Sequence, residues 1–203
     1  MNLPNKLTIA RMCAIPVVIV VSVLSFLKTV SDVINVQLLI LLVVFTLASF
    51  TDFLDGKIAR KYNLVTNFGK FMDPLADKLL VMATMISMLE LGIFEAFDIS
   101  FGFVITIILA REFAITGLRT LAADNGVVIA ASKLGKSKTV TQMAMIIYVL
   151  AINMIDINNN IGVAKDIITL VLVSLATIMT IVSGIDYFIK NANVLKEKNN
   201  KEN

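Results

Sequence analysis

The sequence predicts an all-α integral membrane protein with six transmembrane helices. Of its 203 residues, 58% are hydrophobic, and the mean hydropathy is +0.87, whereas soluble domains are about half apolar. Six apolar runs each approach the roughly 20 residues that a helix needs to cross a membrane, once their amphipathic ends are included. In chain order these runs are Met12–Leu27, Val36–Phe53, Leu79–Phe94, Ile99–Leu118 with a charged pair inside it, Val140–Ile155 and Ile167–Ile185.

The connections between these runs are too short to hold a hydrophobic core of their own. We therefore expect one transmembrane domain over residues 1–189, followed by a polar cytoplasmic tail over 190–203. The first run could instead belong to a cleaved signal peptide, because basic residues precede it. No small-x-small cleavage site follows, however, and Pro4-Asn5 with Thr8 is typical of a helix start.

The distribution of basic residues predicts the orientation in the membrane. If the N-terminus is cytoplasmic, the inner side receives 16 of the 18 Lys and Arg residues, and the outer loops keep only Lys28 and Lys165. This asymmetry agrees with the positive-inside rule for short loops. We therefore expect a multi-pass protein of the bacterial cytoplasmic membrane, with both termini and the active site facing the cytoplasm.

Two residue types are almost missing, which limits the possible chemistry. Cys13 is the only cysteine, so no intramolecular disulfide can form, and the chain has no histidine. A general base must then be a carboxylate or, less favourably, a Lys or Tyr. Zinc sites, which depend on Cys and His ligands, are not expected.

Four aspartates lie at the facing ends of the second and third runs. Asp52 and Asp55 are one helical turn apart, and Asp73 and Asp77 are i, i+4 neighbours, so each pair shares a helix face. Carboxylates brought together in this way need cations to offset their repulsion. Their oxygens suit Mg²⁺ or Mn²⁺, and two such ions commonly polarise phosphoryl oxygens. The stretch therefore predicts a metal site that handles phosphates.

Small residues and one arginine accompany the aspartates. Gly56, Ala59 and Gly69 would leave room for a ligand close to the helix backbone, and Arg60 could bind a pyrophosphate through two parallel hydrogen bonds. The alternative is that the aspartates only form salt bridges with neighbouring Lys and Arg side chains at the helix ends. Four acids together with small residues at helical spacing favour the metal site.

The pattern D-x2-D-G-x2-A-R-x8-G-x3-D-x3-D, over residues 52–77, resembles the signature of the CDP-alcohol phosphatidyltransferase family at every fixed position. The segments LPNKLTIAR, REFAITGLR and GVVIAASKLGKSKTVTQM resemble the phosphatidylglycerophosphate synthase branch of this family in bacteria. The resemblance implies the six-helix fold of the family. It also implies two divalent cations on Asp52, Asp55, Asp73 and Asp77, of which Asp77 would deprotonate the acceptor alcohol.

The resemblance further implies where the CDP part of the lipid substrate binds. Gly56 and Arg60 would contact it, beside the small residues Ala59 and Gly69 of the same signature. Three residues outside the signature or between its fixed positions would complete the nucleotide pocket: Asn5, Thr8 and Thr66. Thr8 could instead be only a hydrogen-bonding residue near a helix terminus.

A second group of charges points to an anionic acceptor. Five cations follow one another with few acids nearby: Arg111, Arg119, Lys133, Lys136 and Lys138. An ionisable residue inside an apolar run, such as Arg111, indicates function by default. Arg111 could instead pair with Glu112, and the lysines could bind lipid headgroups. A phosphate-bearing acceptor such as sn-glycerol 3-phosphate fits this cluster better than serine does.

The predicted reaction transfers a phosphatidyl group from CDP-diacylglycerol to sn-glycerol 3-phosphate, giving phosphatidylglycerophosphate and CMP. Phosphatidylglycerol or an inositol phosphate could be the acceptor in the same chemistry. A divalent-cation transporter is the alternative from another class, since intramembrane acids also mark ion pathways. Membrane lipid and a second copy of the chain, in a homodimer, are the expected partners, and nucleic acid is not.

Overall fold

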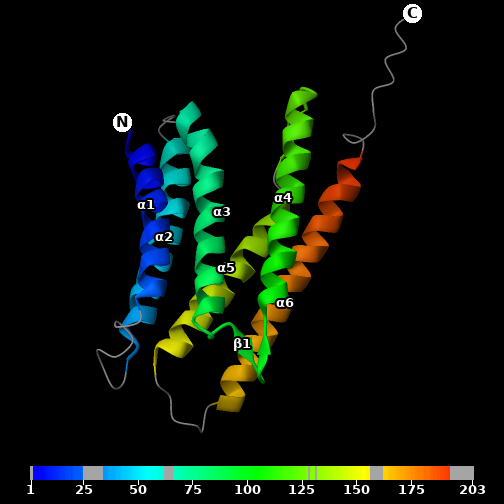
Figure 1. The fold of residues 1–203 in the computed structure, drawn as a ribbon. Helices are drawn as coiled ribbons and strands as arrows, with labels where there is room; N and C mark the ends of the chain where they lie inside the picture. The colour runs from blue at the N-terminus through cyan, green and yellow to red at the C-terminus, as the bar shows by residue number, and fades with distance from the viewer. Residues whose placement is uncertain are drawn as a thin grey trace, which may run out of the picture.

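The computed structural model describes residues 2–24, 34–61, 66–127, 129–130, 132–155 and 162–192, and the side chains of residues 3, 4, 53–61, 67 and 70 lie outside this description. The described residues form six helices and one short hairpin (Figure 1). In chain order these elements are α1 (Leu3–Val23), α2 (Val36–Lys61), α3 (Asn67–Glu90), β1 (Glu95–Ala96), β2 (Ile99–Ser100), α4 (Gly102–Asp124), α5 (Lys133–Met154) and α6 (Gly162–Lys190).

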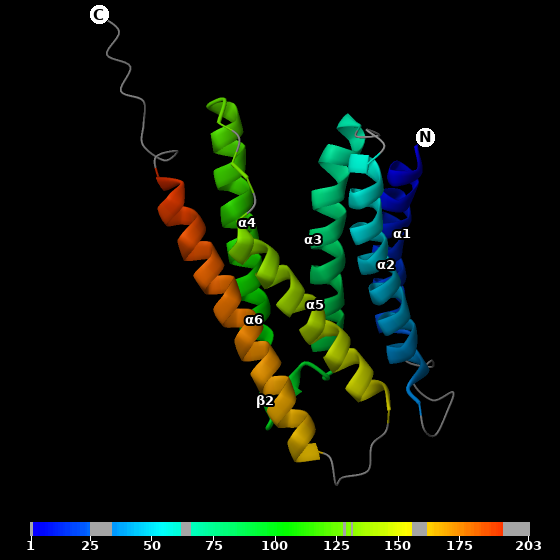
Figure 2. The same ribbon diagram turned by 180° about the vertical axis from the view of Figure 1, so that it is seen from behind.

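The helices form two groups that α5 joins. Helix α1 packs against α2 and α3, and α4 packs against α6. Helix α5 runs obliquely behind α3 and α4 in Figure 1 and crosses in front of them in Figure 2, and it packs against both α6 and α2. The start of α1 and the end of α6 lie at the same end of the bundle, together with the end of α2 and the start of α3.

The apolar core occupies the part of the bundle away from that end. Phe45 of α2, Met85 of α3, Ile108 of α4 and Met145 of α5 are all fully buried in one cluster. Packing of this kind, by close contact between apolar side chains, is what holds helices together where lipid rather than water surrounds them.

The helices continue beyond the apolar runs at the end where the charged residues gather. Helix α3 begins at Asn67, twelve residues before its apolar run, because the Thr66 hydroxyl caps it by accepting a hydrogen bond from Gly69 N at 3.0 Å. Ser132 caps α5 in the same way through Gly135 N, also at 3.0 Å. Helix α1 begins at Leu3 after Asn2, which confirms the predicted helix start.

The hairpin is the departure from the all-α prediction. Helix α3 ends at Glu90, and Gly92 follows with a φ of 67°. Phe97 and Asp98 both have positive φ and form the two-residue turn that suits the twist of paired strands. The backbone N–H of Phe97 donates to Asp166 Oδ2 of α6 at 3.3 Å, so the hairpin ties the α3–α4 junction to the last helix.

Two described helices are long and apolar enough to cross a membrane by length and composition, at Asn5–Val23 and Gly162–Lys190, and a shorter apolar stretch covers Val36–Asp52. The remaining helices carry most of the charged residues of the site described below, which lowers their mean hydropathy. The tail predicted from residue 190 lies outside the described residues beyond Ala192, while Lys190 itself ends α6.

Candidate active site

The predicted carboxylates approach one another from two helices. Asp52 lies on α2, and Asp73 and Asp77 lie one turn apart on α3. Asp52 lies within electrostatic range of Asp73 and of Asp77. Asp55 lies on α2, but its side chain is outside the described part of the structure.

Helix α1 holds two of these acids in place. Arg11 is fully buried, and its Nη1 lies 2.8 Å from Asp52 Oδ1. The Thr8 hydroxyl donates to Asp73 Oδ1 at 2.5 Å. Because Thr8 and Arg11 are three residues apart, one face of α1 contacts both α2 and α3. Arg11 was not predicted as a site residue and entered only the count of basic residues that predicts the membrane orientation. Its position one helical turn after Thr8 would have indicated that both side chains lie on the same face of α1.

The chemistry of these donors fits a hard divalent cation. Carboxylate oxygens are the ligands that Mg²⁺ and Mn²⁺ prefer, and Asp52 lies within electrostatic range of two further predicted acids, Asp73 and Asp77. Among the described residues, no group of three or more His, Cys, Asp or Glu side chains is close enough to hold an ion together. The fourth acid, Asp55, lies outside that search. Asp52, Asp73 and Asp77 therefore lie in the same region, but their side chains are not close enough together to coordinate one ion.

The residues predicted for the nucleotide pocket form a small polar contact between α1 and the start of α3. Thr66 donates from its hydroxyl to Asn5 Oδ1 at 2.9 Å while it also caps α3. A Cβ at Gly69 would lie 3.3 Å from Asn5 Oδ1 and 3.5 Å from Asp73 Oδ2. Glycine at 69 therefore lets Asn5 approach the acids. Gly56, Ala59 and Arg60 lie in the stretch of α2 whose side chains are not described.

A cavity of about 250 Å³ opens beside Asp77, between α3 and α4, and residues of α5 and α6 close it. Asp77 and Lys78 line it from α3. Four of the five predicted acceptor cations line it from α4 and α5: Arg111, Arg119, Lys136 and Lys138. The carboxylate predicted to be the base and the cations predicted to bind an anion therefore share one pocket.

Each arginine in this pocket is held by a partner from α6. Arg111 donates from Nη2 to Ser183 Oγ at 3.2 Å and from Nη1 to Glu112 Oε1 at 3.0 Å, which is the pairing foreseen as an alternative. Arg119 donates from Nε to Tyr187 Oη at 2.7 Å, and its guanidinium carbon lies 5.4 Å from the centre of that ring. The two guanidinium groups are thereby oriented before any ligand binds.

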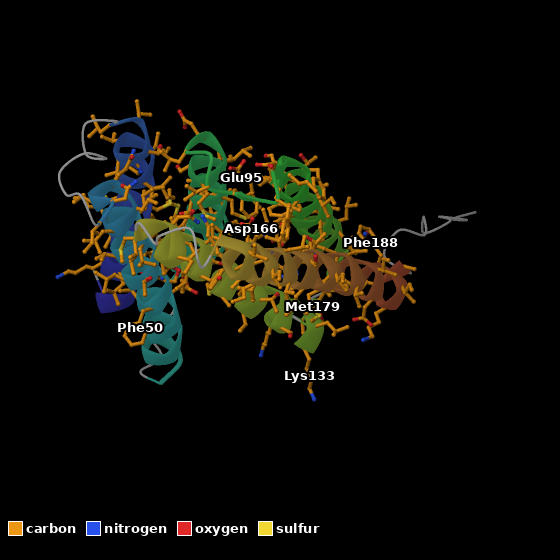
Figure 3. All side chains as sticks on the ribbon, turned by 90° about the horizontal axis from the view of Figure 1, so that it is seen from below. Phe50, Glu95, Lys133, Asp166, Met179 and Phe188 are labelled. Carbon is orange, nitrogen blue, oxygen red and sulfur yellow. The ribbon has the colours of Figure 1, made fainter. Side chains whose placement is uncertain are left out.

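Lys133 stands apart from this group. It is exposed at the first residue of α5 and lines a neighbouring cavity of about 460 Å³ with Lys190 and Asp186 of α6. Figure 3 shows its side chain extending outward from the start of α5. The structure therefore brings four of the five predicted cations together and leaves Lys133 beside them.

The pocket lining includes polar residues that were not predicted as part of the site, among them Glu112, Gln142 and Tyr187. Glu112 is an acid inside an apolar run, the same signal that singled out Arg111. Gln142 is buried and donates to Thr180 Oγ1 of α6 at 3.0 Å. Tyr187 lies 68 residues from Arg119 in the sequence, so no local sequence pattern could predict the hydrogen bond between them.

Comparison with known proteins assigns the chain to a family. The model of the CDP-alcohol phosphatidyltransferases matches residues 1–185. The chain is 40% identical to a CDP-diacylglycerol–glycerol-3-phosphate 3-phosphatidyltransferase of Bacillus subtilis, over 98% of this chain and 99% of that one. It is 41% identical to a Rickettsia bellii protein of the same name, over 92% and 93% of the two chains. It is 32% identical to a probable phosphatidylglycerophosphate synthase of Mycobacterium tuberculosis, over 92% and 79%. The chain therefore belongs to the CDP-alcohol phosphatidyltransferase family, and its apolar helices agree with a bacterial membrane protein.

Proposed function

We propose that the chain transfers the phosphatidyl group of CDP-diacylglycerol to sn-glycerol 3-phosphate, giving phosphatidylglycerophosphate and CMP. The similar proteins named for this reaction cover nearly the whole chain. The structural observation that supports the proposal most directly is the pocket, because Asp77 lines it together with Arg111, Arg119 and Lys138. A phosphate-bearing alcohol placed there has its charge against the cations and its hydroxyl within the reach of an acid.

Asp52, Asp55, Asp73 and Asp77 would hold two divalent cations, Mg²⁺ or Mn²⁺. The family is generally dependent on divalent metals, and the donor set at the ends of α2 and α3 is made of carboxylates. When bound, such cations polarise the phosphoryl oxygens and offset the charge that develops on the departing phosphate. Arg11 and Thr8 support the proposal because they orient two of the acids.

Asp77 acts as the base in this proposal. It takes the proton of the acceptor hydroxyl, whose oxygen then attacks the phosphorus that carries the diacylglycerol. The new phosphorus–oxygen bond forms as the bond to the CMP phosphate breaks, and CMP leaves with the bonding electron pair. Asp77 lines the pocket directly, so the acceptor hydroxyl can reach it. The protein contributes mainly orientation and electrostatic stabilisation.

The CDP part of the lipid would lie on the side of the acids away from the pocket, against the start of α1, the end of α2 and the start of α3. Asn5, Thr8, Thr66 and Gly69 meet there. We assign the same role to three residues of α2, with Arg60 offsetting the charge of the departing CMP: Gly56, Ala59 and Arg60.

In the membrane, all six helices would span the bilayer, with both termini and the pocket at the cytoplasmic face. The start of α1 and the end of α6 share one end of the bundle (Figure 1), as six passes require. Lys133 would lie at the surface, near anionic headgroups. We also propose that two copies of the chain associate through their apolar helix faces.

A transporter for divalent cations is not favoured, because a metal ion that left the acids through the pocket would be repelled by the five cations that line it: Lys78, Arg111, Arg119, Lys136 and Lys138. The positive charge of this lining instead suits an enzyme that binds an anionic substrate next to its acidic residues.

The test is CMP release by detergent-purified protein supplied with CDP-diacylglycerol and Mg²⁺. We expect release with sn-glycerol 3-phosphate and much less with serine, inositol phosphate or phosphatidylglycerol. Release with one of these other acceptors instead would keep the chemistry of the acids but overturn the acceptor assignment. No release with any acceptor, from protein that still melts cooperatively, would refute the proposal.

A further inference from the structure

One buried acid in the pocket has no role in the proposed reaction. Glu112 of α4 is 9% exposed and contacts three cations. Its Oε1 accepts hydrogen bonds from Lys138 Nζ and, at 3.0 Å, from Arg111 Nη1, and its Oε2 lies 3.8 Å from Lys78 Nζ. These cations come from three different helices, α3, α4 and α5.

Three cations held so close together would repel one another without this carboxylate. Lys138 shows the dependence most clearly, because it is 6% exposed, and among the described residues Glu112 is the acid that forms an ion pair with it. Removing one partner of a buried pair leaves an uncompensated charge, which costs far more than the pair contributes on balance. Glu112 is therefore the group on which the position of Lys138 depends, and it holds Lys78 together with Thr116, whose hydroxyl accepts a hydrogen bond from Lys78 Nζ.

Arg111 uses only part of its guanidinium on Glu112. Its Nη2 donates to Ser183, and among the described residues its buried Nε has no hydrogen-bond partner. Buried donors of this kind are rare and call for a partner. Arg111 lines the pocket, as do Arg119 and Lys136, neither of which forms a salt bridge with an acid in the described part of the chain.

We propose that Glu112 is a positioning residue for the acceptor, which divides the cations of the pocket into two sets. It fixes Lys78 and Lys138 in the pocket wall beside Asp77. The acceptor phosphate then binds to the second set: Arg111, Arg119 and Lys136. This inference rests on the proposed function and narrows it, since Lys138 becomes part of the frame rather than a ligand of the phosphate.

The consequence is a separation between binding and turnover. Without the Glu112 charge, the pocket becomes more positive, so an anionic acceptor is still attracted. Lys138, released from Glu112 and close enough to Asp77 for their charges to interact, would turn toward the phosphate or toward Asp77. The acceptor hydroxyl would then be misplaced, and small misplacements of reacting groups lower the rate strongly.

The test is a double-mutant cycle on residues 112 and 138. CMP release is measured against sn-glycerol 3-phosphate concentration for Glu112→Gln, Lys138→Met and the double variant. We expect Glu112→Gln to lower kcat about ten- to hundredfold, the loss of one charge-assisted hydrogen bond. KM should stay within about threefold of the parent protein, because the glutamine oxygen can still accept the hydrogen bond from Arg111 Nη1. The double variant removes both charges, so its kcat should exceed that of Glu112→Gln. Glu90→Gln, the same change at the exposed end of α3, should leave both constants unchanged.

Two outcomes would overturn the proposal. If Lys138→Met raises KM about tenfold and the double variant is no better than Glu112→Gln, Lys138 binds the phosphate directly. If Glu112→Gln keeps the parent kcat, Glu112 positions nothing. Should Glu112→Gln fail to melt cooperatively in detergent, Glu112→Asp, which keeps the charge, must give an intermediate kcat with an unchanged KM. If the parent protein uses another acceptor, the proposed function fails, and the same cycle run with that acceptor still decides the role of Glu112.

Discussion

Replacing Gly184 by Ala should weaken binding of the acceptor, because the added methyl group would press on Arg111. A Cβ at position 184 would lie 3.1 Å from Arg111 Cγ, whereas carbon atoms pack best at about 3.5–4.0 Å. Arg111 must then move by about 0.4 Å or more. Its guanidinium is held by Glu112 at 3.0 Å and by Ser183 at 3.2 Å. A movement of this size stretches the longer contact beyond hydrogen-bonding distance.

The size of the effect follows from that lost contact. A hydrogen bond contributes about 1 kcal/mol on balance, which corresponds to roughly a fivefold change in an equilibrium constant. We expect KM for sn-glycerol 3-phosphate to rise about fivefold, with a smaller change in kcat, because the lost interaction serves binding in the ground state and the transition state alike. Thermal stability should not fall in parallel, since alanine favours a helix interior over glycine by up to about 1 kcal/mol.

The assay is CMP release at saturating CDP-diacylglycerol with varied acceptor. Gly117→Ala on α4 is the matched control, because a Cβ there meets no atom within 4 Å, and its KM should equal that of the parent protein. Ser183→Ala removes the same hydrogen bond without adding a methyl group and should raise KM in the same direction. An unchanged KM in both Gly184→Ala and Ser183→Ala would show that the position of Arg111 does not govern acceptor binding.

Four further predictions concern the acids, their supports and the metal. Asp77→Asn should lower kcat about 10²- to 10⁴-fold, the usual contribution of a general base, without lowering the melting temperature; retention of full turnover would refute the base assignment. Thr8→Val removes the hydrogen bond to Asp73 and should destabilise the protein by about 1 kcal/mol, measured by thermal melting, while shifting the Mg²⁺ concentration needed for half-maximal activity; an unchanged Mg²⁺ requirement would mean that Asp73 needs no support from α1. Arg119→Lys loses the Nε donor to Tyr187 and the planar stack on its ring, so KM for the acceptor should rise severalfold despite the retained charge, and equal KM values would contradict this reading. Chelation by EDTA should abolish CMP release, and added Mg²⁺ or Mn²⁺ should restore it; release that persists in EDTA would refute the metal site.

The helices could be predicted from the sequence because their signals are local. Apolar runs, Pro4 near the first helix start and the spacing of Asp73 and Asp77 all depend on residues within one or two turns of one another. The helix ends were predicted poorly for the opposite reason. The third apolar run continues to Phe94, but helix α3 ends at Glu90, because Gly92 adopts a positive φ and a hairpin follows. Hydrophobicity alone does not distinguish a strand from the end of a helix.

In the candidate site, too, local features could be predicted from the sequence, whereas contacts between distant residues could not. The signature from Asp52 to Asp77 could be found because it is continuous in sequence, and Arg111 because a charge inside an apolar run is rare. The contact between Arg119 and Tyr187 spans 68 residues and depends on how α4 and α6 cross, which no periodicity predicts. Lys133 shows the limit of sequence proximity: it is near Lys136 in sequence, but it extends outward from the first residue of α5 (Figure 3).

The acids and the cations of the candidate site lie mainly on different helices, and on each side a buried ion of the other sign pairs with one of them. The acids lie on α2 and α3, where buried Arg11 pairs with Asp52. The cations lie mainly on α4 and α5, where buried Glu112 pairs with Lys138. Acids and cations mixed on one face would neutralise one another and leave little charge for ligands. Keeping them apart leaves one side attractive to divalent cations and the other to an anionic alcohol, while the single counter-ions limit the repulsion within each side. Asp77 lies where the two sides meet, which is the position that the proposed base needs in order to act on an alcohol bound by the cations next to a phosphate bound by the acids and their metal ions.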